Sequence, residues 1–175
     1  MPKILGSWSA MREYLEKEML AESLAGRVRY GCTSYVGMDG AKIFEICIDG
    51  KQFKRFSPET VNSYFIEKGY KEKTKYLDKR EYWEGFWTLL REYPVNERTE
   101  YTDEELCEAL ELYRNSDVQD SIRSENPLVR MFAVLDRRVG KRTLAQIQSE
   151  MKTSPDWLLQ IYRIRIEAEK ISVIF

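Results

Sequence analysis

Residues 27–56 read RVRYGCTSYVGMDGAKIFEICIDGKQFKRF, and the fold class follows from this stretch. Apolar and polar residues alternate along it with a period of two, which is typical of strands that bury one face. Two turn signals, Met38-Asp39-Gly40 and Asp49-Gly50, divide it into three segments. Because short turns of this kind join antiparallel strands, the pattern predicts a three-stranded antiparallel meander.

The hydrophobic pattern also predicts the register of the first hairpin. A two-residue turn at Asp39-Gly40 would place the apolar residues of the first two strands on opposite faces of the sheet. A three-residue loop, Met38-Asp39-Gly40 with Gly40 left-handed, gathers them on one face, and we prefer it. This register points Cys32 and Cys47 to opposite sides of the sheet, where they cannot form a disulfide.

Helix signals lie on both sides of the predicted sheet. On the N-terminal side, a helix is predicted to begin after Ser7 and to end before Gly26. Its apolar face consists of residues three and four positions apart: Trp8, Met11, Leu15, Met19 and Leu20. On the C-terminal side, Ser57-Pro58-Glu59 is a strong helix start, and Gly69 closes that helix.

The remainder of the chain is predicted to be helical. Helices are expected over 79–92, after a capping box at 102–105, from Asn126-Pro127 to Gly140, over about 143–151, and over 155–170. We therefore predict an α+β fold. Residues 1–75 would form an α-β-β-β-α module, and the helical region 76–175 would pack onto it to give one compact unit.

Composition excludes several classes of function. The 175 residues include no histidine, so Ser-His-Asp and Cys-His nucleophile systems and His-ligated metals are excluded. The 28 basic and 29 acidic residues nearly cancel and indicate no particular partner. The three cysteines have no C-x-x-C spacing and are expected to be reduced thiols, with no metal or cofactor. No apolar run reaches the length of a membrane span, which predicts a cytoplasmic protein without a membrane partner.

The densest basic run in the chain is Arg137-Arg138-Val139-Gly140-Lys141-Arg142. Phosphate or an acidic partner could bind to such a run. A simpler interpretation is that its cations cap a helix that ends at Gly140, where they would complement the helix dipole. Both interpretations remain open from the sequence.

The segment that follows this run has the spacing of a helix-turn-helix motif. Residues 143–151 would form the supporting helix, and a recognition helix would be entered through Ser154-Pro155. Gln148 stands where the motif needs a small residue, and Lys152 replaces the customary turn glycine, so an ordinary helical hairpin is the alternative. If the region binds nucleic acid, the candidate phosphate contacts are Arg137, Arg138, Lys141, Arg142 and Arg163.

A magnesium-dependent nuclease is a further hypothesis. Asp39 followed by Asp49-Gly50-Lys51 has the residue types of a nuclease centre, in which carboxylates hold Mg²⁺ and a lysine lies beside the phosphate. Both aspartates precede a glycine at a predicted hairpin turn, where Asp-Gly is the expected dipeptide. The turn interpretation is therefore favoured.

An aromatic stripe lies on the predicted helix 79–92. Trp83, Phe86 and Trp87 recur there at helical spacing, together with Leu90. This spacing favours a place in the core over a cage for a ligand.

Several segments resemble a family of small bacterial proteins of unknown function. The segments are residues 135–144 (LDRRVGKRTL), 162–169 (YRIRIEAE), 8–12 (WSAMR) and the hairpin around Cys32-Thr33-Ser34-Tyr35. The resemblance implies a small cytoplasmic bacterial protein of the kind carried on mobile elements. It transfers no functional residue.

The sequence favours a non-catalytic protein that binds another macromolecule, because no cluster of nucleophile, base and oxyanion donors can be assembled from its motifs. The partner is expected to be a protein. The first alternative is nucleic-acid binding through the basic, helix-turn-helix-like C-terminal third. The second alternative is the magnesium-dependent nuclease.

Overall fold

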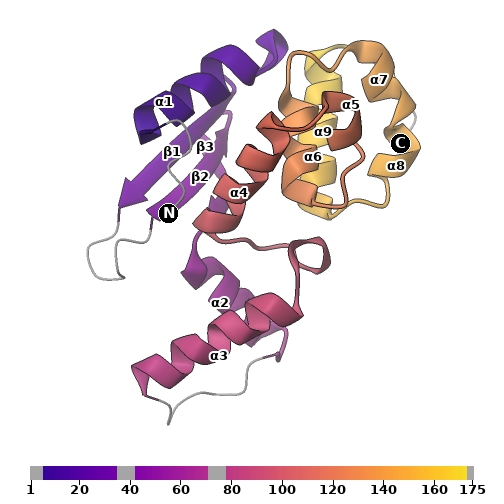
Figure 1. Ribbon diagram of the computed structural model, residues 1–175. Helices are drawn as coiled ribbons and strands as arrows, with labels where there is room; N and C mark the ends of the chain where they lie inside the picture. Colours follow the sequence, from indigo (N-terminus) through magenta and orange to yellow (C-terminus); the bar gives the residue numbers. More distant parts are fainter. Residues whose placement is uncertain (1–5, 35–41, 71–77, 173–175) are drawn as a thin grey trace.

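The computed structural model describes residues 6–34, 42–70 and 78–172 and confirms an α+β fold (Figure 1). The first helix, α1, spans Trp8–Glu13, and the Ser7 hydroxyl caps it by accepting a hydrogen bond from the Ala10 amide. The helical path continues as a π-helix over Tyr14–Met19, followed by a 3₁₀ turn over Glu22–Leu24. The predicted start and apolar face of this segment are confirmed, since Met11, Leu15, Met19 and Leu20 are buried.

Three strands follow in the predicted meander: β1 (Val28–Ser34), β2 (Lys42–Ile48) and β3 (Lys51–Phe56), in the order β1-β2-β3. One face of the sheet belongs to the main core, where Phe44 lies against Trp8 and Phe56 stacks on Tyr101. The other face is more polar and carries the Glu45–Arg55 ion pair. An antiparallel sheet with one covered face accounts for the alternating pattern of the sequence.

The predicted faces of the first hairpin are confirmed, but its pairing is wrong by two residues. A three-residue loop would place Cys32 opposite Ile46, whereas the structure pairs Cys32 with Phe44 and Tyr30 with Ile46. A shift of two residues leaves every side chain on the same face, so the hydrophobic pattern cannot detect it. The predicted loop Met38-Asp39-Gly40 itself lies outside the described residues.

The two remaining predictions about the sheet agree with the structure. Cys47 pairs with Arg29, one step out of phase with Cys32, and both cysteines are free thiols. The second turn is formed by Asp49 and Gly50, which both have positive φ angles, of 51° and 78°. Successive left-handed residues are the geometry that an Asp-Gly hairpin turn requires.

Helices α2 (Pro58–Glu67) and α3 (Lys79–Glu92) form a separate unit, which we call the arm. In Figure 1 the arm lies apart from the sheet and from the other helices. It has its own small apolar cluster of Val61, Tyr64, Phe65 and Phe86. The rings of Phe65 and Phe86 join the two helices edge to face at 6.1 Å.

The remaining helices and the sheet share the main core. After a 3₁₀ turn at Val95–Glu97, α4 (Asp103–Arg114) begins with the predicted capping box of Thr102 and Glu105. Helix α4 contacts β2 and α6, and α6 contacts α5 and α9. The other helices are α5 (Val118–Ser121), α6 (Pro127–Leu135), α7 (Lys141–Gln146), α8 (Gln148–Met151) and α9 (Asp156–Ala168).

Two predicted helix boundaries are wrong. Helix α6 ends at Leu135 rather than at Gly140, because residues 135–137 pair with residues 19–21 of the N-terminal segment: the Ala21 amide bonds to the Leu135 carbonyl. The predicted helix 143–151 is divided into α7 and α8 at Ile147, which leaves helical geometry with ψ near 4°. In the first case a contact distant in sequence ends the helix, so no local signal marks the boundary.

Candidate functional site

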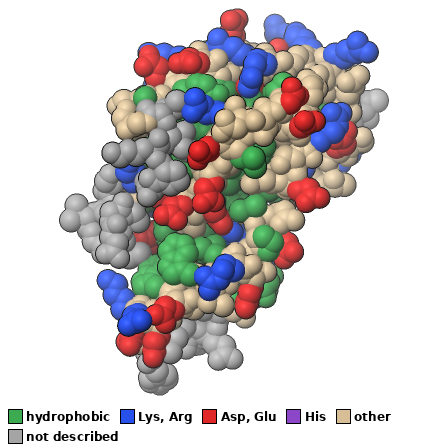
Figure 2. All heavy atoms as spheres, in the orientation of Figure 1, with side chains coloured by type: hydrophobic (Ala, Val, Ile, Leu, Met, Phe, Trp, Pro, Cys, Tyr) green, Lys and Arg blue, Asp and Glu red, His purple; other side chains and the backbone are tan. Residues whose placement is uncertain are grey.

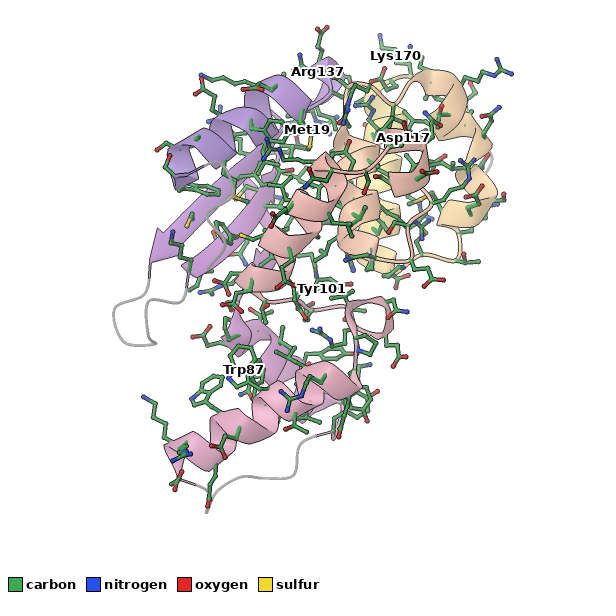
Figure 3. The ribbon with its side chains drawn as sticks, viewed as in Figure 1. Met19, Trp87, Tyr101, Asp117, Arg137 and Lys170 are labelled. Carbon is green, nitrogen blue, oxygen red and sulfur yellow. The ribbon has the colours of Figure 1, made fainter. Side chains whose placement is uncertain are left out.

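The basic run at 137–142 contains two arginines that are bound within the molecule. The backbone amide of Arg137 donates to the Met19 carbonyl at 2.8 Å, and its side chain donates to the carbonyls of Leu20 and Lys17. These contacts satisfy carbonyls at the end of the N-terminal helical segment, which would otherwise lack partners. Figure 3 shows Met19 and Arg137 together at this junction. Arg137 thus caps a helical segment, although not the helix that the sequence predicted.

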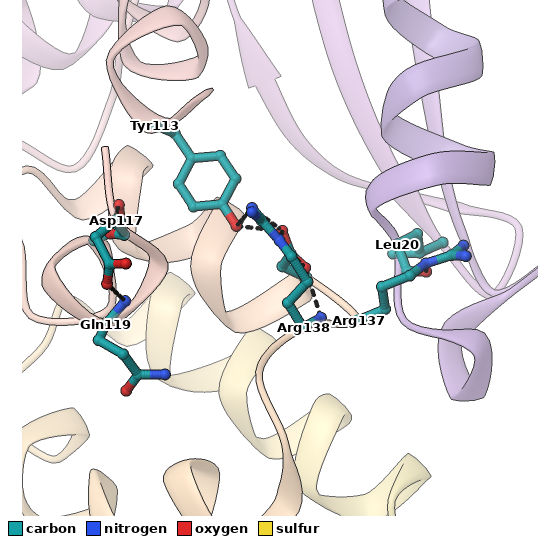
Figure 4. A network of polar contacts seen from close by, with 8 residues as sticks. Leu20, Tyr113, Asp117, Gln119, Arg137 and Arg138 are labelled. Atoms are coloured by element: carbon teal, nitrogen blue, oxygen red, sulfur yellow. Dashed lines mark hydrogen bonds and ion pairs between the residues drawn. The ribbon is translucent and has the colours of Figure 1, made fainter. Parts of the chain in front are cut away.

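Arg138 belongs to a buried polar network with Asp136 and Tyr113 (Figure 4). Its guanidinium contacts both carboxylate oxygens of Asp136 and donates to the Tyr113 hydroxyl at 3.1 Å, and that hydroxyl donates to Asp136. The Asp136 side chain is 1% exposed, whereas that of Arg138 is 56% exposed. Burial, together with the Asp136 hydrogen bond, raises the pKa of Tyr113. The network ties α4 to the segment that follows α6.

Arg165 of α9 is buried against the same segment. It donates to the Val139 carbonyl at 3.0 Å and forms an ion pair with Glu169 at 3.2 Å. The Glu169 carboxylate also accepts from the Ser23 hydroxyl at 2.7 Å. Burial lowers the pKa of Arg165, and the Glu169 charge acts in the opposite direction. The segment 135–139 therefore joins the N-terminal segment, α4 and α9.

The other predicted phosphate contacts lie on the surface. Lys141 and Arg142 are exposed in the first turn of α7, which contains no acidic residue. Arg163 is exposed on α9, which is the helix that corresponds to the predicted recognition helix. All five candidates are therefore exposed, and two of them, Arg137 and Arg138, also form hydrogen bonds to distant segments of the chain.

The predicted nuclease residues take the positions of a turn. Both oxygens of the Asp49 carboxylate accept hydrogen bonds from Arg27 at 2.9 Å, and this bonding lowers the pKa of Asp49. Lys51 is exposed, and Asp39 lies outside the described residues. Among the residues that the structure describes, no three acidic or cysteine side chains are grouped as metal ligands would be.

The prediction that the aromatic stripe belongs to the core is wrong for one of its members. Phe86 is fully buried and Trp83 is half-buried, but Trp87 is 41% exposed. Figure 2 shows a hydrophobic area over the arm, and Figure 3 places Trp87 at its surface. Figure 3 places Trp87 on the side of α3 toward α2, and α2 leaves its indole partly uncovered.

Two buried cations bind the segment between α3 and α4, and one of them, Arg98, links the arm to α4. Arg98 is fully buried, donates to the carbonyls of Tyr93 and Glu100, and forms a two-point ion pair with Glu105 of the α4 capping box. Lys54 of β3 donates to the Thr99 carbonyl at 2.6 Å. Its ammonium lies 4.9–6.0 Å from the ring centroids of three aromatic residues, which are Phe56, Tyr101 and Trp157.

The sequence analysis did not identify Arg98 or Lys54 as buried cations. Lys54 is two positions before Phe56 on the same strand, so the alternation of side chains already places it on the inward face of the sheet. For Arg98 the sequence gives no periodic signal, because it lies between a 3₁₀ turn and a helix.

The comparisons with known proteins bear on the family and not on an activity. No curated protein and no solved structure matches the chain. No described helix has the length and apolar character needed to cross a membrane. The model of the SF0329 protein family matches residues 7–166, which include the arm, the sheet and nearly all of α9. The chain therefore belongs to the SF0329 protein family.

Proposed function

We propose that this protein is a macromolecular interaction module that binds its partner through the exposed side of α3 that carries Trp87. The observation that carries the proposal is the exposure of Trp87, because a large aromatic side chain at the surface is typical of binding hot spots. Trp83, one turn earlier on the same side, is half-buried and extends the apolar surface. Cations border the two indoles, and arginine is also enriched in such interfaces.

Site-specific photo-crosslinking tests this proposal. A photoreactive amino acid introduced at position 87 is expected to give a crosslinked adduct in cells of the natural source. Leu112 is the matched control, since it is a large apolar residue with 51% exposure on α4. Adducts from position 87 that are absent from position 112 would support the proposal. Equal adducts, or none from position 87, would contradict it.

Nucleic-acid binding is a second candidate function. Its support is that Lys141, Arg142 and Arg163 are exposed, and that the first turn of α7 holds cations although a helix N-terminus favours carboxylates. If these residues contact phosphates, affinity for labelled duplex DNA will fall steeply with added salt, and Arg142→Ala will weaken binding. Binding that is insensitive to both changes would remove this candidate.

A further inference from the structure

The side of α3 that carries Trp87 has an ordered charge pattern that bears on the identity of its partner. Four residues, Arg80, Trp83, Trp87 and Arg91, follow one another at steps of three, four and four positions and so lie along one side of the helix. We call them the α3 stripe. Its centre is aromatic and both of its ends are cationic. At 1.5 Å per residue, the Cα atoms of its terminal arginines are about 16 Å apart along the helix axis.

The charges of the stripe are available to a partner. The Arg80 side chain is 86% exposed and forms an ion pair at 2.8 Å with the Glu84 carboxylate, which is 63% exposed. Pairs this exposed contribute little and exchange readily. Arg91 is also exposed and donates to the Thr88 hydroxyl at 3.2 Å. A carboxylate from a partner could therefore bind either arginine without disrupting the core.

A second copy of the chain fits the stripe poorly. If two α3 helices paired in antiparallel orientation with Trp83 opposite Trp87, Arg91 of one copy would face Lys79 and Arg80 of the other. A parallel pairing would place Arg80 against Arg80. Like charges face each other in both orientations, which disfavours association.

A nucleic acid also fits the stripe poorly. Residues 58–92 contain seven acidic and seven basic side chains, so the segment that forms the arm has no net positive charge to attract a phosphate backbone.

From the stripe we infer that the partner is an amphipathic protein helix, apolar at its centre and acidic at both ends, that packs along α3. Such a helix would bury Trp87 with its apolar side chains and pair a carboxylate with each arginine, in the helix-in-groove mode of recognition. This inference rests on the proposed function, because it specifies the partner of the same surface.

Selection from a displayed library of helical peptides, about 16 residues long so that they span both arginines, tests the inference against the full chain. Peptides that bind are expected to be enriched in Asp and Glu near both ends and in large apolar residues between them. Their affinity should fall at least about tenfold in Trp87→Ala, as expected for a hot-spot tryptophan, and remain unchanged in Leu112→Ala. The charge-reversed variant Arg80→Glu/Arg91→Glu should select Lys and Arg at the same positions.

The outcomes separate the inference from the proposed function. Peptides that depend on Trp87 but lack acidic ends would overturn the inference and leave the interaction surface intact. The absence of any peptide that depends on Trp87 would overturn both. Sedimentation that shows a dimer in the wild type and a monomer in Trp87→Ala would assign the surface to a second copy and overturn the inference. An unchanged circular dichroism spectrum and melting temperature would show that Trp87→Ala still folds.

Discussion

At the scale of single residues, several cations of this protein connect segments that are distant in the sequence. Arg137 and Arg98 donate to backbone carbonyls, and Lys54 donates to Thr99. A sequence pattern cannot separate such residues from solvated ones, because the distinguishing carbonyls belong to distant segments. The basic run at 137–142 could therefore be found from the sequence, but not the hydrogen bonds that Arg137 and Arg138 form to distant segments.

The Asp136 network gives a prediction for residue 138. Replacing Arg138 by alanine removes the main ionic partner of a buried carboxylate, and we expect the free energy of unfolding to fall by about 1–3 kcal/mol. Arg142→Ala, an exposed residue of the same run, should change it by less than about 0.5 kcal/mol. Urea unfolding of both variants measures the difference. Equal effects would mean that the network contributes nothing to stability.

Lys54 gives a prediction about pH. Burial lowers the pKa of its ammonium below the ordinary value, although Glu100 partly offsets this. Between the lowered and the ordinary pKa, the unfolded chain binds a proton that the folded chain has released, so this group makes the folded state more stable as pH rises. Below that window its unfavourable contribution is constant. Lys54→Met lacks the group, so the stability of the wild type relative to this variant should increase from pH 7 to about 10.

Urea unfolding of wild type and Lys54→Met across this pH range makes the measurement. Taking the difference between the two proteins cancels the contribution of the tyrosines to the pH dependence of unfolding, because both proteins contain them. A difference in unfolding free energy that stays constant with pH would contradict the prediction.

At the scale of secondary-structure elements, local sequence motifs predicted where most helices begin but not where all of them end. Ser7, Ser57, Thr102 and Asn126 all cap helices as their sequence motifs predict. The predicted end of α6 was wrong because the helix is ended by a contact with residues 19–21. The predicted pairing of β1 with β2 was wrong because a shift of two residues does not change the hydrophobic pattern. The α3 surface was missed because helical spacing says which residues share a side, not whether another element covers that side.

At the scale of the whole molecule, the apolar residues form two clusters. The main core joins the sheet, the N-terminal segment and the C-terminal helices, and the arm holds the second cluster. The helical part of the sequence showed no boundary between them, since both clusters include ordinary amphipathic helices.

The two clusters predict that the arm can open separately. Arg98→Ala leaves the Glu105 carboxylate without its two-point partner and removes the bonds to Tyr93 and Glu100. We expect amides of α2 and α3 to exchange with solvent at least about tenfold faster, with a smaller change in α6. Arg123→Ala is the control, because its ion pair with Glu150 is on the surface. Hydrogen exchange detected by mass spectrometry measures these rates. A uniform increase in the exchange rate over all helices would show that the two clusters unfold together.

The junction between Arg137 and the N-terminal segment also bears on the order of folding. Arg137 and Leu20 are 117 positions apart in a chain of 175 residues, so their contact closes a loop of about two thirds of the chain. The entropic cost of closing so long a loop delays the contact until much of the intervening chain is ordered. Arg137→Ala is therefore expected to accelerate unfolding while leaving the folding rate nearly unchanged in stopped-flow experiments. In kinetic terms, this junction forms late and limits how quickly the native state is lost.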